Sequence, residues 1–244
     1  MLAYPAEKYA SKALYLGLPD YDDMSFLIEF LRPNDVFVDV GANIGLYTML
    51  GASVVKSGGR VLAFEPNPLA VQRLVENIKL NGITNVGIRH AAVGVGPGSV
   101  RITTGLDTRN HVVRDYKVGA SVEVPLVSLD QETSAFHRVN LVKMDVEGFE
   151  SEVLKGARCL LARKVPAVWS VEVNGLGEQY GSGNRTIYAL FAEFGYQAFR
   201  YNGRNKTLHR HSDPDAEASS NLIFARDTAD ILRRMPARLV CDRA

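Results

Sequence analysis

The chain has 244 residues, 46% hydrophobic and 23% charged, a composition typical of a single α/β domain rather than two. Its net charge of +1 gives no general electrostatic reason to bind nucleic acid or an anionic membrane. The apolar runs are shorter than the roughly 20 residues that span a bilayer, the first residues do not resemble a signal peptide, and the two cysteines lack metal or redox spacing, so we expect a cytoplasmic protein.

Strand and helix patterns alternate along most of the chain. We expect a partly helical N-terminal cap over residues 1–34, with its best helix at 24–31, then one domain over 35–226 and a tail over 227–244. Within the domain, apolar runs predict strands at 36–40, 60–64, 86–90, 141–144 and 168–173. Helices are predicted between them, at 44–55, 68–81 and 149–156. This alternation favours a mostly parallel sheet with helices on both faces.

The alternation breaks between residues 94 and 128. Residues 100–103 and 122–127 are predicted antiparallel strands, whereas 105–121 is polar and without periodicity. A loop of this length inside a domain is usually functional or mobile, so we expect it to cover the site of a second substrate; an ordinary surface loop is the alternative. A further helix is predicted at 186–194, followed by two last strands at 196–201 and 221–225.

The turn after the first predicted strand is the most informative feature. An apolar strand runs into a glycine-containing turn, and a helix follows, with the pattern Asp39-x-Gly41-x-Asn43-x-Gly45. Glycine permits positive φ there and lets backbone N–H groups approach a ligand. The second strand ends in Glu65, and an acid at this place can accept both hydroxyls of a ribose. The two strand ends together predict a pocket for an adenosine-containing cofactor.

The spacing of the glycines in this turn distinguishes between classes of adenosine-containing cofactor. A dinucleotide site requires Gly-x-Gly-x-x-Gly, but here Asn43 occupies the middle position and the last glycine comes one residue early. No Gly-Lys-Ser/Thr follows, so a P-loop is excluded. Asp39 would repel a phosphate, whereas it suits a ligand with an ammonium and a sulfonium, such as S-adenosylmethionine. An ordinary strand-to-helix turn is the alternative.

Acidic residues follow four of the predicted parallel strands. Ligands bind outside the carboxyl ends of the strands in open α/β sheets, and these ends carry Asp39, Glu65, Asp145 and Glu172. Helix capping is the alternative for Asp145 and Glu147. If the acceptor of a methyl group is an alcohol, a base should remove its proton, and our candidates are Asp145, Glu147 and His111. We expect no metal; a Mg²⁺ site at Asp145, Glu172 and Asn174 is the alternative.

Several segments resemble the FkbM-type methyltransferases. They are 37–48, 63–68, 77–85, 127–130 and 141–150, the last of which contains Asp-Val-Glu-Gly, a more specific signature than the glycine turn. The resemblance implies a class I, Rossmann-like fold with a seven-stranded, mostly parallel sheet whose last strand is antiparallel. It also implies a cofactor site at Asp39, Gly41, Ala42, Asn43, Gly45, Glu65, Pro66, Asn67, Ala91, Ala92 and Asp145, with His90 beside the adenine. Residues 105–121 depart from the serine-rich stretch expected there.

The resulting hypothesis is an S-adenosylmethionine-dependent O-methyltransferase. The resemblance implies that it acts on a hydroxyl of a sugar or a polyketide-like natural product, a small-molecule acceptor. From the charge and the short apolar runs we expect no nucleic-acid or membrane partner. One alternative is a nicotinamide-dependent oxidoreductase, which the glycine spacing disfavours. Another is a non-catalytic binding protein with a vestigial cofactor fold, which would be expected to lose Glu65 or the glycine turn. RNA methylation is disfavoured by the charge balance.

Overall fold

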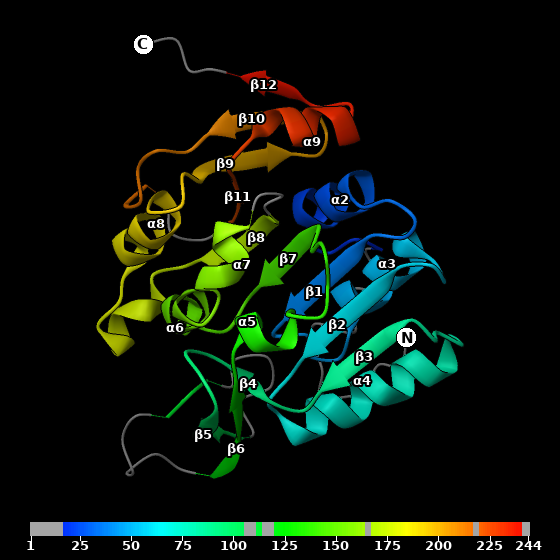
Figure 1. Ribbon diagram of the computed structural model, residues 1–244, viewed down its shortest axis with the longest axis vertical. Helices are drawn as coiled ribbons and strands as arrows, with labels where there is room; N and C mark the ends of the chain where they lie inside the picture. Colours follow the sequence, from blue (N-terminus) through cyan, green and yellow to red (C-terminus); the bar gives the residue numbers. More distant parts are fainter. Residues whose placement is uncertain (1–16, 105–110, 114–119, 164–166, 217–219, 241–244) are drawn as a thin grey trace.

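The computed structural model describes residues 17–104, 111–113, 120–163, 167–216 and 220–240. Within these residues, a main sheet of nine strands has the order β12-β10-β9-β11-β8-β7-β1-β2-β3 (Figure 1). Its strands are β1 (Val36–Val40), β2 (Arg60–Phe64), β3 (Val86–Arg89), β7 (Leu141–Met144), β8 (Val168–Val173), β9 (Gln197–Asn202), β10 (Thr207–Arg210), β11 (Ser220–Ala225) and β12 (Arg238–Val240). Five of these strands, β1, β2, β3, β7 and β8, lie within one residue of the bounds that the sequence predicts.

Seven of these strands have the arrangement of a class I methyltransferase. Strands β3, β2, β1, β7 and β8 are parallel neighbours, and β11 lies antiparallel between β8 and β9. The predicted α/β class, parallel sheet and antiparallel last strand are therefore confirmed. The predicted number of seven strands is wrong for the described residues, because β10 pairs antiparallel with β9 and β12 pairs with β10, which extends that edge of the sheet.

Helices cover both faces of the main sheet, as predicted (Figure 1). Successive residues of a strand point to opposite faces, so Val38 and Val40 pack with α6 (Glu150–Lys155), α7 (Arg158–Ala162) and α8 (Asn184–Ala192). Phe37 instead packs on the other face, with α2 (Tyr21–Phe30) and α3 (Leu46–Val55). The remaining helices are α4 (Pro68–Leu80), α5 (Leu129–Glu132), α9 (Thr228–Arg234) and the 3₁₀ turn η2 (Leu176–Tyr180).

A second, small sheet follows β3. In the described residues its order is β4-β6-β5, from β4 (Ala92–Val93), β5 (Gly98–Thr103) and β6 (Ser121–Val127). Strands β5 and β6 are antiparallel, as the sequence predicts. This sheet lies on the side to which β1 and β2 point (Figure 1). The predicted covering loop falls largely on 105–110 and 114–119, which lie outside the described residues.

Both ends of the described chain pack on the same face of the main sheet. Buried residues of α2 share one apolar cluster with Ile231 of α9 and with Met235. Arg234 of α9 forms an ion pair with Asp35, just before β1, with Nη1 and Oδ2 2.6 Å apart. Residues 228–240, which we expected to belong to a tail, thus contain a helix and a strand of the main sheet.

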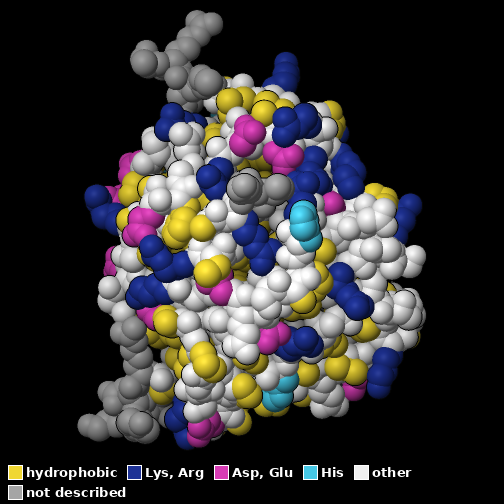
Figure 2. Space-filling view, in the orientation of Figure 1, with side chains coloured by type: hydrophobic (Ala, Val, Ile, Leu, Met, Phe, Trp, Pro, Cys, Tyr) yellow, Lys and Arg dark blue, Asp and Glu magenta, His cyan; other side chains and the backbone are white. Residues whose placement is uncertain are grey.

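Charged side chains of both signs are mixed on one face of the molecule (Figure 2). On the face in Figure 2, Lys and Arg side chains are scattered among Asp and Glu side chains. None of the helices described is long and apolar enough to cross a membrane.

Candidate functional site

A cavity of about 420 Å³ opens at the carboxyl ends of β1, β2, β7 and β8. Its walls include residues of α2, the turn after β1, the small sheet and Asn221 of β11. This is the edge at which ligands bind in open α/β sheets. Of the predicted cofactor residues, those that line the cavity are Gly41, Ala42, Asn43, Glu65, Pro66, Asn67, Ala91, Ala92 and Asp145.

The turn after β1 is held close to the end of β7. Gly41 has φ +83°, and a Cβ on it would overlap the backbone oxygen of Asp145. The backbone N–H groups of Gly41 and Ala42 both donate to the carbonyl of Phe64 in β2, at 3.0 and 2.9 Å. Gly45, with φ +94°, does not contribute to the described cavity wall; a Cβ there would overlap Leu74 of α4. Glycine is therefore needed at position 41 so that the turn can approach the end of β7, and at position 45 so that it can approach α4.

Glu65 connects the turn after β1 to the start of α4. Its Oε2 accepts a hydrogen bond from the N–H of Asn43 and its Oε1 from the N–H of Asn67, both at 2.8 Å. Burial raises the pKa of Glu65 to about 7, although these backbone hydrogen bonds oppose the shift. A carboxylate oxygen can accept more than one hydrogen bond. The side chain can therefore hold the turn and still accept ligand hydroxyls.

The wall beyond Glu65 is mostly apolar. Ala91, Ala92 and Val93 line it with Phe64 and Ile102. His90 is exposed, and its Nε2 lies 3.0 Å from the carbonyl oxygen of Pro66. Apolar walls with a few polar groups are typical of sites for flat, partly apolar ligands.

Asp39 lies beneath the cavity instead of in its described wall. Its side chain is fully buried, and Oδ2 accepts a hydrogen bond from Thr48 Oγ1 at 2.6 Å. Oδ1 has no hydrogen-bond partner in the part of the chain that the structure describes. Burial raises the pKa of Asp39, and Lys143 opposes this shift. Asp39 is therefore not among the described residues that line the cavity.

Lys143 is a cavity residue that we did not predict. It belongs to β7, is 3% exposed, and forms an ion pair with Asp145, with Nζ and Oδ2 3.1 Å apart. The ammonium also lies 4.6 Å from the centre of the Tyr47 ring. Burial lowers the pKa of Lys143, but the carboxylates of Asp145 and Asp39 outweigh it and hold the pKa above its usual value. A lysine within the buried strand Leu-Val-Lys-Met was a visible signal, because buried charges require a partner.

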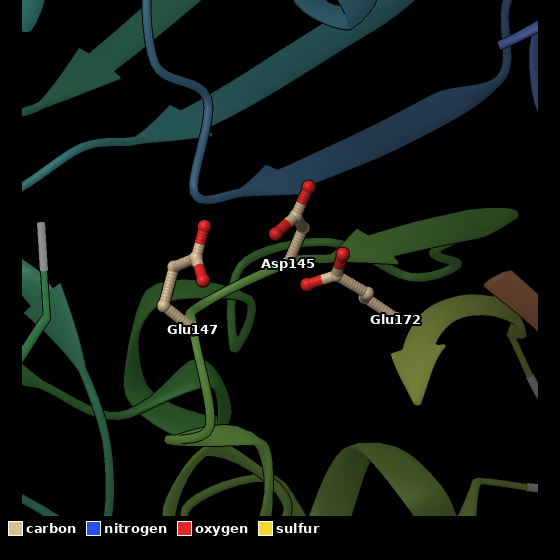
Figure 3. Close-up of side chains that lie close together, drawn as sticks. All are labelled: Asp145, Glu147 and Glu172. Atoms are coloured by element: carbon tan, nitrogen blue, oxygen red, sulfur yellow. The ribbon is translucent and has the colours of Figure 1, made fainter. Parts of the chain in front are cut away.

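Three carboxylates gather between the ends of β7 and β8. Asp145, Glu147 and Glu172 have oxygen atoms within 4.8 Å of one another (Figure 3). Burial raises the pKa of Asp145, but Lys143 outweighs it and the pKa is lowered. Burial and the neighbouring Asp145 raise the pKa of Glu172 to about 9. Asp145 and Glu172 therefore differ in protonation near neutral pH.

The alternative to our expectation of no metal is a Mg²⁺ site at Asp145, Glu172 and Asn174, and the structure groups the side chains differently. Asn174 donates through Nδ2 to Glu172 Oε2 at 2.8 Å and accepts from the N–H of Leu176 at 3.0 Å, so it is committed to its own turn. The structure instead brings Glu147 next to Asp145 and Glu172. These three carboxylates offer oxygen ligands, although Lys143 already neutralises Asp145.

His111 also reaches the cavity wall. Its backbone N–H donates to Thr103 Oγ1 at 3.1 Å, and its carbonyl accepts from the N–H of Thr103 at 3.0 Å, which pairs this residue with the end of β5. The cavity is also lined by residues that we did not predict, among them Asp20, Asp23, Tyr47 and Asn221. Asp23 and Asn221 are 198 residues apart in sequence, so no local pattern could have joined them.

Known methyltransferases are similar in sequence to this chain. Hexuronic acid methyltransferase AglP of Haloferax volcanii is 32% identical over 139 residues, 56% of this chain and 56% of that protein. Methyltransferase 1 of Beauveria bassiana is 27% identical over 148 residues, 51% of this chain and 59% of that protein. The chain therefore spans little more than half the length of these relatives.

A solved structure and a family model complete the comparison. The crystal structure of methyltransferase FkbM from Methylobacillus flagellatus is 19% identical and covers 90% of this chain and 55% of that chain, but a TM-score of 0.48 is too low to support an argument. The model of the methyltransferase FkbM domain matches residues 39–198, well over half of the chain, from β1 to β9. The chain belongs to the FkbM-domain methyltransferase family.

Proposed function

We propose that the protein transfers a methyl group from S-adenosylmethionine to a hydroxyl oxygen of a sugar-like or polyketide-like small molecule. The observation that carries this proposal is the cavity at the strand ends, where Glu65 lies beside the turn at Gly41–Asn43. Membership of a methyltransferase family supports it. A cytoplasmic location remains a prediction.

The cavity residues fit S-adenosylmethionine. Glu65 would accept the ribose hydroxyls, Ala91 and Ala92 would contact the adenine, and the turn would hold the methionine part. The turn is narrow because Gly41 has no Cβ and lies directly against the end of β7. Asp145 and the other cavity carboxylates favour a ligand with positive charge over a dinucleotide phosphate.

S-adenosylmethionine, when bound, supplies a methyl group on a positively charged sulfur. The chain has to align the acceptor oxygen with that methyl group and exclude water, which is mainly catalysis by proximity and orientation. Asp145 is our first candidate for the base, because Lys143 keeps its carboxylate ionised. Glu147 and His111 are the next candidates, since both line the same cavity. With a pKa of about 9, Glu172 is protonated near neutral pH and is a poorer base.

The sugar-like acceptor is supported by a relative. The Haloferax volcanii protein is named a hexuronic acid methyltransferase, so a sugar derivative is its acceptor. We extend only the sugar character to this chain.

Calorimetry with S-adenosylmethionine and S-adenosylhomocysteine tests the proposal. Glu65→Gln removes the charge from hydrogen bonds worth about 1.5–3 kcal/mol each, so the affinity should fall at least tenfold while the melting temperature shows an intact fold. Glu123→Gln is the matched control, because Glu123 is exposed on β6. Tight binding of NADH without binding of S-adenosylmethionine would disprove the proposed function.

A further inference from the structure

Part of the cavity wall is formed by residues that are not among the predicted cofactor residues. It is formed by Asp20 and Asp23 at the start of α2, by Tyr47 at the start of α3, and by Asn221 in β11. Because β11 runs antiparallel, its first residues meet the carboxyl end of β8, and Asn221 pairs in register with Glu172. This wall is therefore next to the carboxylates that we propose as the reaction centre.

Asp23 and Asn221 form a paired hydrogen-bonding group in this wall. Asn221 Nδ2 donates to Asp23 Oδ2 at 2.6 Å. Among the described residues, neither side chain makes another hydrogen bond, so the second carboxylate oxygen, the amide oxygen and one amide hydrogen are available to a ligand. Such a pair presents two acceptors and a donor side by side, which matches neighbouring hydroxyl groups.

Tyr47 adds an aromatic surface to this wall. The residue is 7% exposed, and the Lys143 ammonium lies 4.6 Å from its ring centre. Its hydroxyl donates to Asp20 Oδ2 at 3.3 Å, which fixes the ring from the other end. An ordered ring beside hydrogen-bonding groups suits a sugar, which has both C–H faces and hydroxyl edges.

The charge of the cavity limits which sugars it can bind. The described residues of the wall include one lysine, Lys143, and six carboxyl groups, those of Asp20, Asp23, Glu65, Asp145, Glu147 and Glu172. Burial raises the pKa of Asp23 to about 7 and that of Glu172 to about 9. Even with these two groups protonated, carboxylates outnumber the lysine, and a buried anion next to like charges is strongly disfavoured.

We propose that Asp23, Asn221 and Tyr47 form the acceptor subsite and that it takes an uncharged sugar in preference to an anionic one. This inference rests on the proposed function, because it assigns the acceptor of the same reaction. A site built to hydrogen-bond hydroxyl groups discriminates against ligands that leave its polar groups unpaired.

Matched sugars test the charge preference. The full chain is loaded with S-adenosylhomocysteine and titrated with methyl glycosides of glucose, galactose and mannose, and with the corresponding uronic acids, in a calorimeter. Methyl transfer from S-adenosylmethionine to the same six compounds is measured in parallel. At least one neutral glycoside should bind, and it should be methylated with a kcat/KM at least tenfold above that of its uronic acid.

Two variants test the residues. Asn221→Ala and Asp23→Asn should each raise the KM for the neutral glycoside at least fivefold and leave S-adenosylhomocysteine affinity within twofold. Asp23→Asn should also reduce the ratio of kcat/KM for the neutral glycoside to kcat/KM for its uronic acid. Asp22→Asn is the control: it makes the same chemical change one residue away, but Asp22 is exposed and accepts from the N–H of Gly203, outside the described wall.

Three results would overturn the inference. The first is a uronic acid that reacts as well as its neutral counterpart. The second is an unchanged KM in both folded subsite variants. The third is binding of S-adenosylmethionine with no binding or methylation of any neutral glycoside. Failure of the proposed function is distinguishable from all three, because S-adenosylmethionine itself would then not bind.

Discussion

At the scale of single residues, the carboxyl groups of the cavity differ because their neighbours differ. Lys143 lowers the pKa of Asp145 against the effect of burial. Burial and Asp145 together raise the pKa of Glu172 to about 9, and burial raises that of Glu65 to about 7. Groups whose environments push their pKa values apart can take different roles as proton acceptor and donor.

The pKa of Glu65 predicts a pH dependence of cofactor binding. If the ionised carboxylate accepts the ribose hydroxyls, protonation removes the charge and affinity falls as the pH drops through about 7. Calorimetry with S-adenosylhomocysteine should show affinity rising from pH 6 to pH 8, by up to about tenfold per pH unit below 7. Glu65→Gln should remove this dependence. If the variant keeps the wild-type pH profile, another group is responsible.

Asp145→Asn is expected to separate three roles of this residue. If Asp145 is the base, the substitution should reduce turnover by roughly 10²–10⁴ with little change in cofactor affinity. As a partner of the cofactor ammonium, its loss should appear mainly in affinity. As a metal ligand, EDTA should abolish wild-type activity and Mg²⁺ restore it; we expect EDTA to have no effect. Wild-type turnover and affinity in the variant would exclude all three roles and direct attention to Glu147 and His111.

At the scale of elements, the site depends on how closely the turn after β1 approaches the end of β7. Gly41 lies against the backbone of Asp145, so the turn and the carboxylate that follows β7 are positioned together. Register supports this, because β1 and β7 are parallel neighbours, with Val40 beside Met144. A side chain at position 41 would therefore separate two walls of the cavity.

Gly41→Ala should be much more destabilising than Gly195→Ala. Both glycines have similar positive φ, +83° and +78°, so both variants suffer a left-handed backbone penalty of about 1–2 kcal/mol. A Cβ at position 195 meets nothing within 4 Å, whereas at position 41 it overlaps the backbone. Urea denaturation should show at least about 2 kcal/mol of additional loss for Gly41→Ala. If both variants lose the same free energy of unfolding, the overlap at position 41 is relieved without an energetic cost.

At the scale of the whole molecule, the C-terminal segment completes one face of the sheet. Ile231 and Met235 are buried in the same cluster as α2 and α3. The Arg234 side chain is 15% exposed, and that of its partner Asp35 is 10% exposed. Removing one partner of a buried ion pair is costly, because the other charge then remains buried alone.

Ile231→Ala is expected to destabilise the whole protein and Leu232→Ala is not. Ile231 is fully buried, so its truncation should cost about 2–5 kcal/mol through lost burial and a cavity. The neighbouring Leu232 is 37% exposed and should cost less than about 1 kcal/mol. Thermal and urea unfolding give both values. If Ile231→Ala has no effect on the main transition, residues 228–240 are a separable tail after all.

Local sequence patterns predicted most of the main sheet. Apolar runs bounded by turns identified β1, β2, β7 and β8 because both faces of these parallel strands are largely buried. Strand β3 was identified in the same way, although its residues are only partly buried or exposed. The pattern was weaker for β10 and β12. Their residues include Arg, His and Thr, which are less typical of a buried strand. Strand β12 is also at the edge of the sheet, with a described neighbour on one side, and short polar edge strands resemble loops.

By itself, the sequence determined the fold class, the methyltransferase family and the turn at Gly41–Asn43 beside Glu65, because these depend on short segments with strong stereochemical requirements. Only the tertiary structure decided which polar side chains meet. It placed Asp39 beneath the cavity, brought Lys143 to Asp145, replaced Asn174 by Glu147 in the carboxylate group, and joined Asp23 to Asn221. Such contacts depend on strand order and on the packing of distant helices, which local periodicity does not encode.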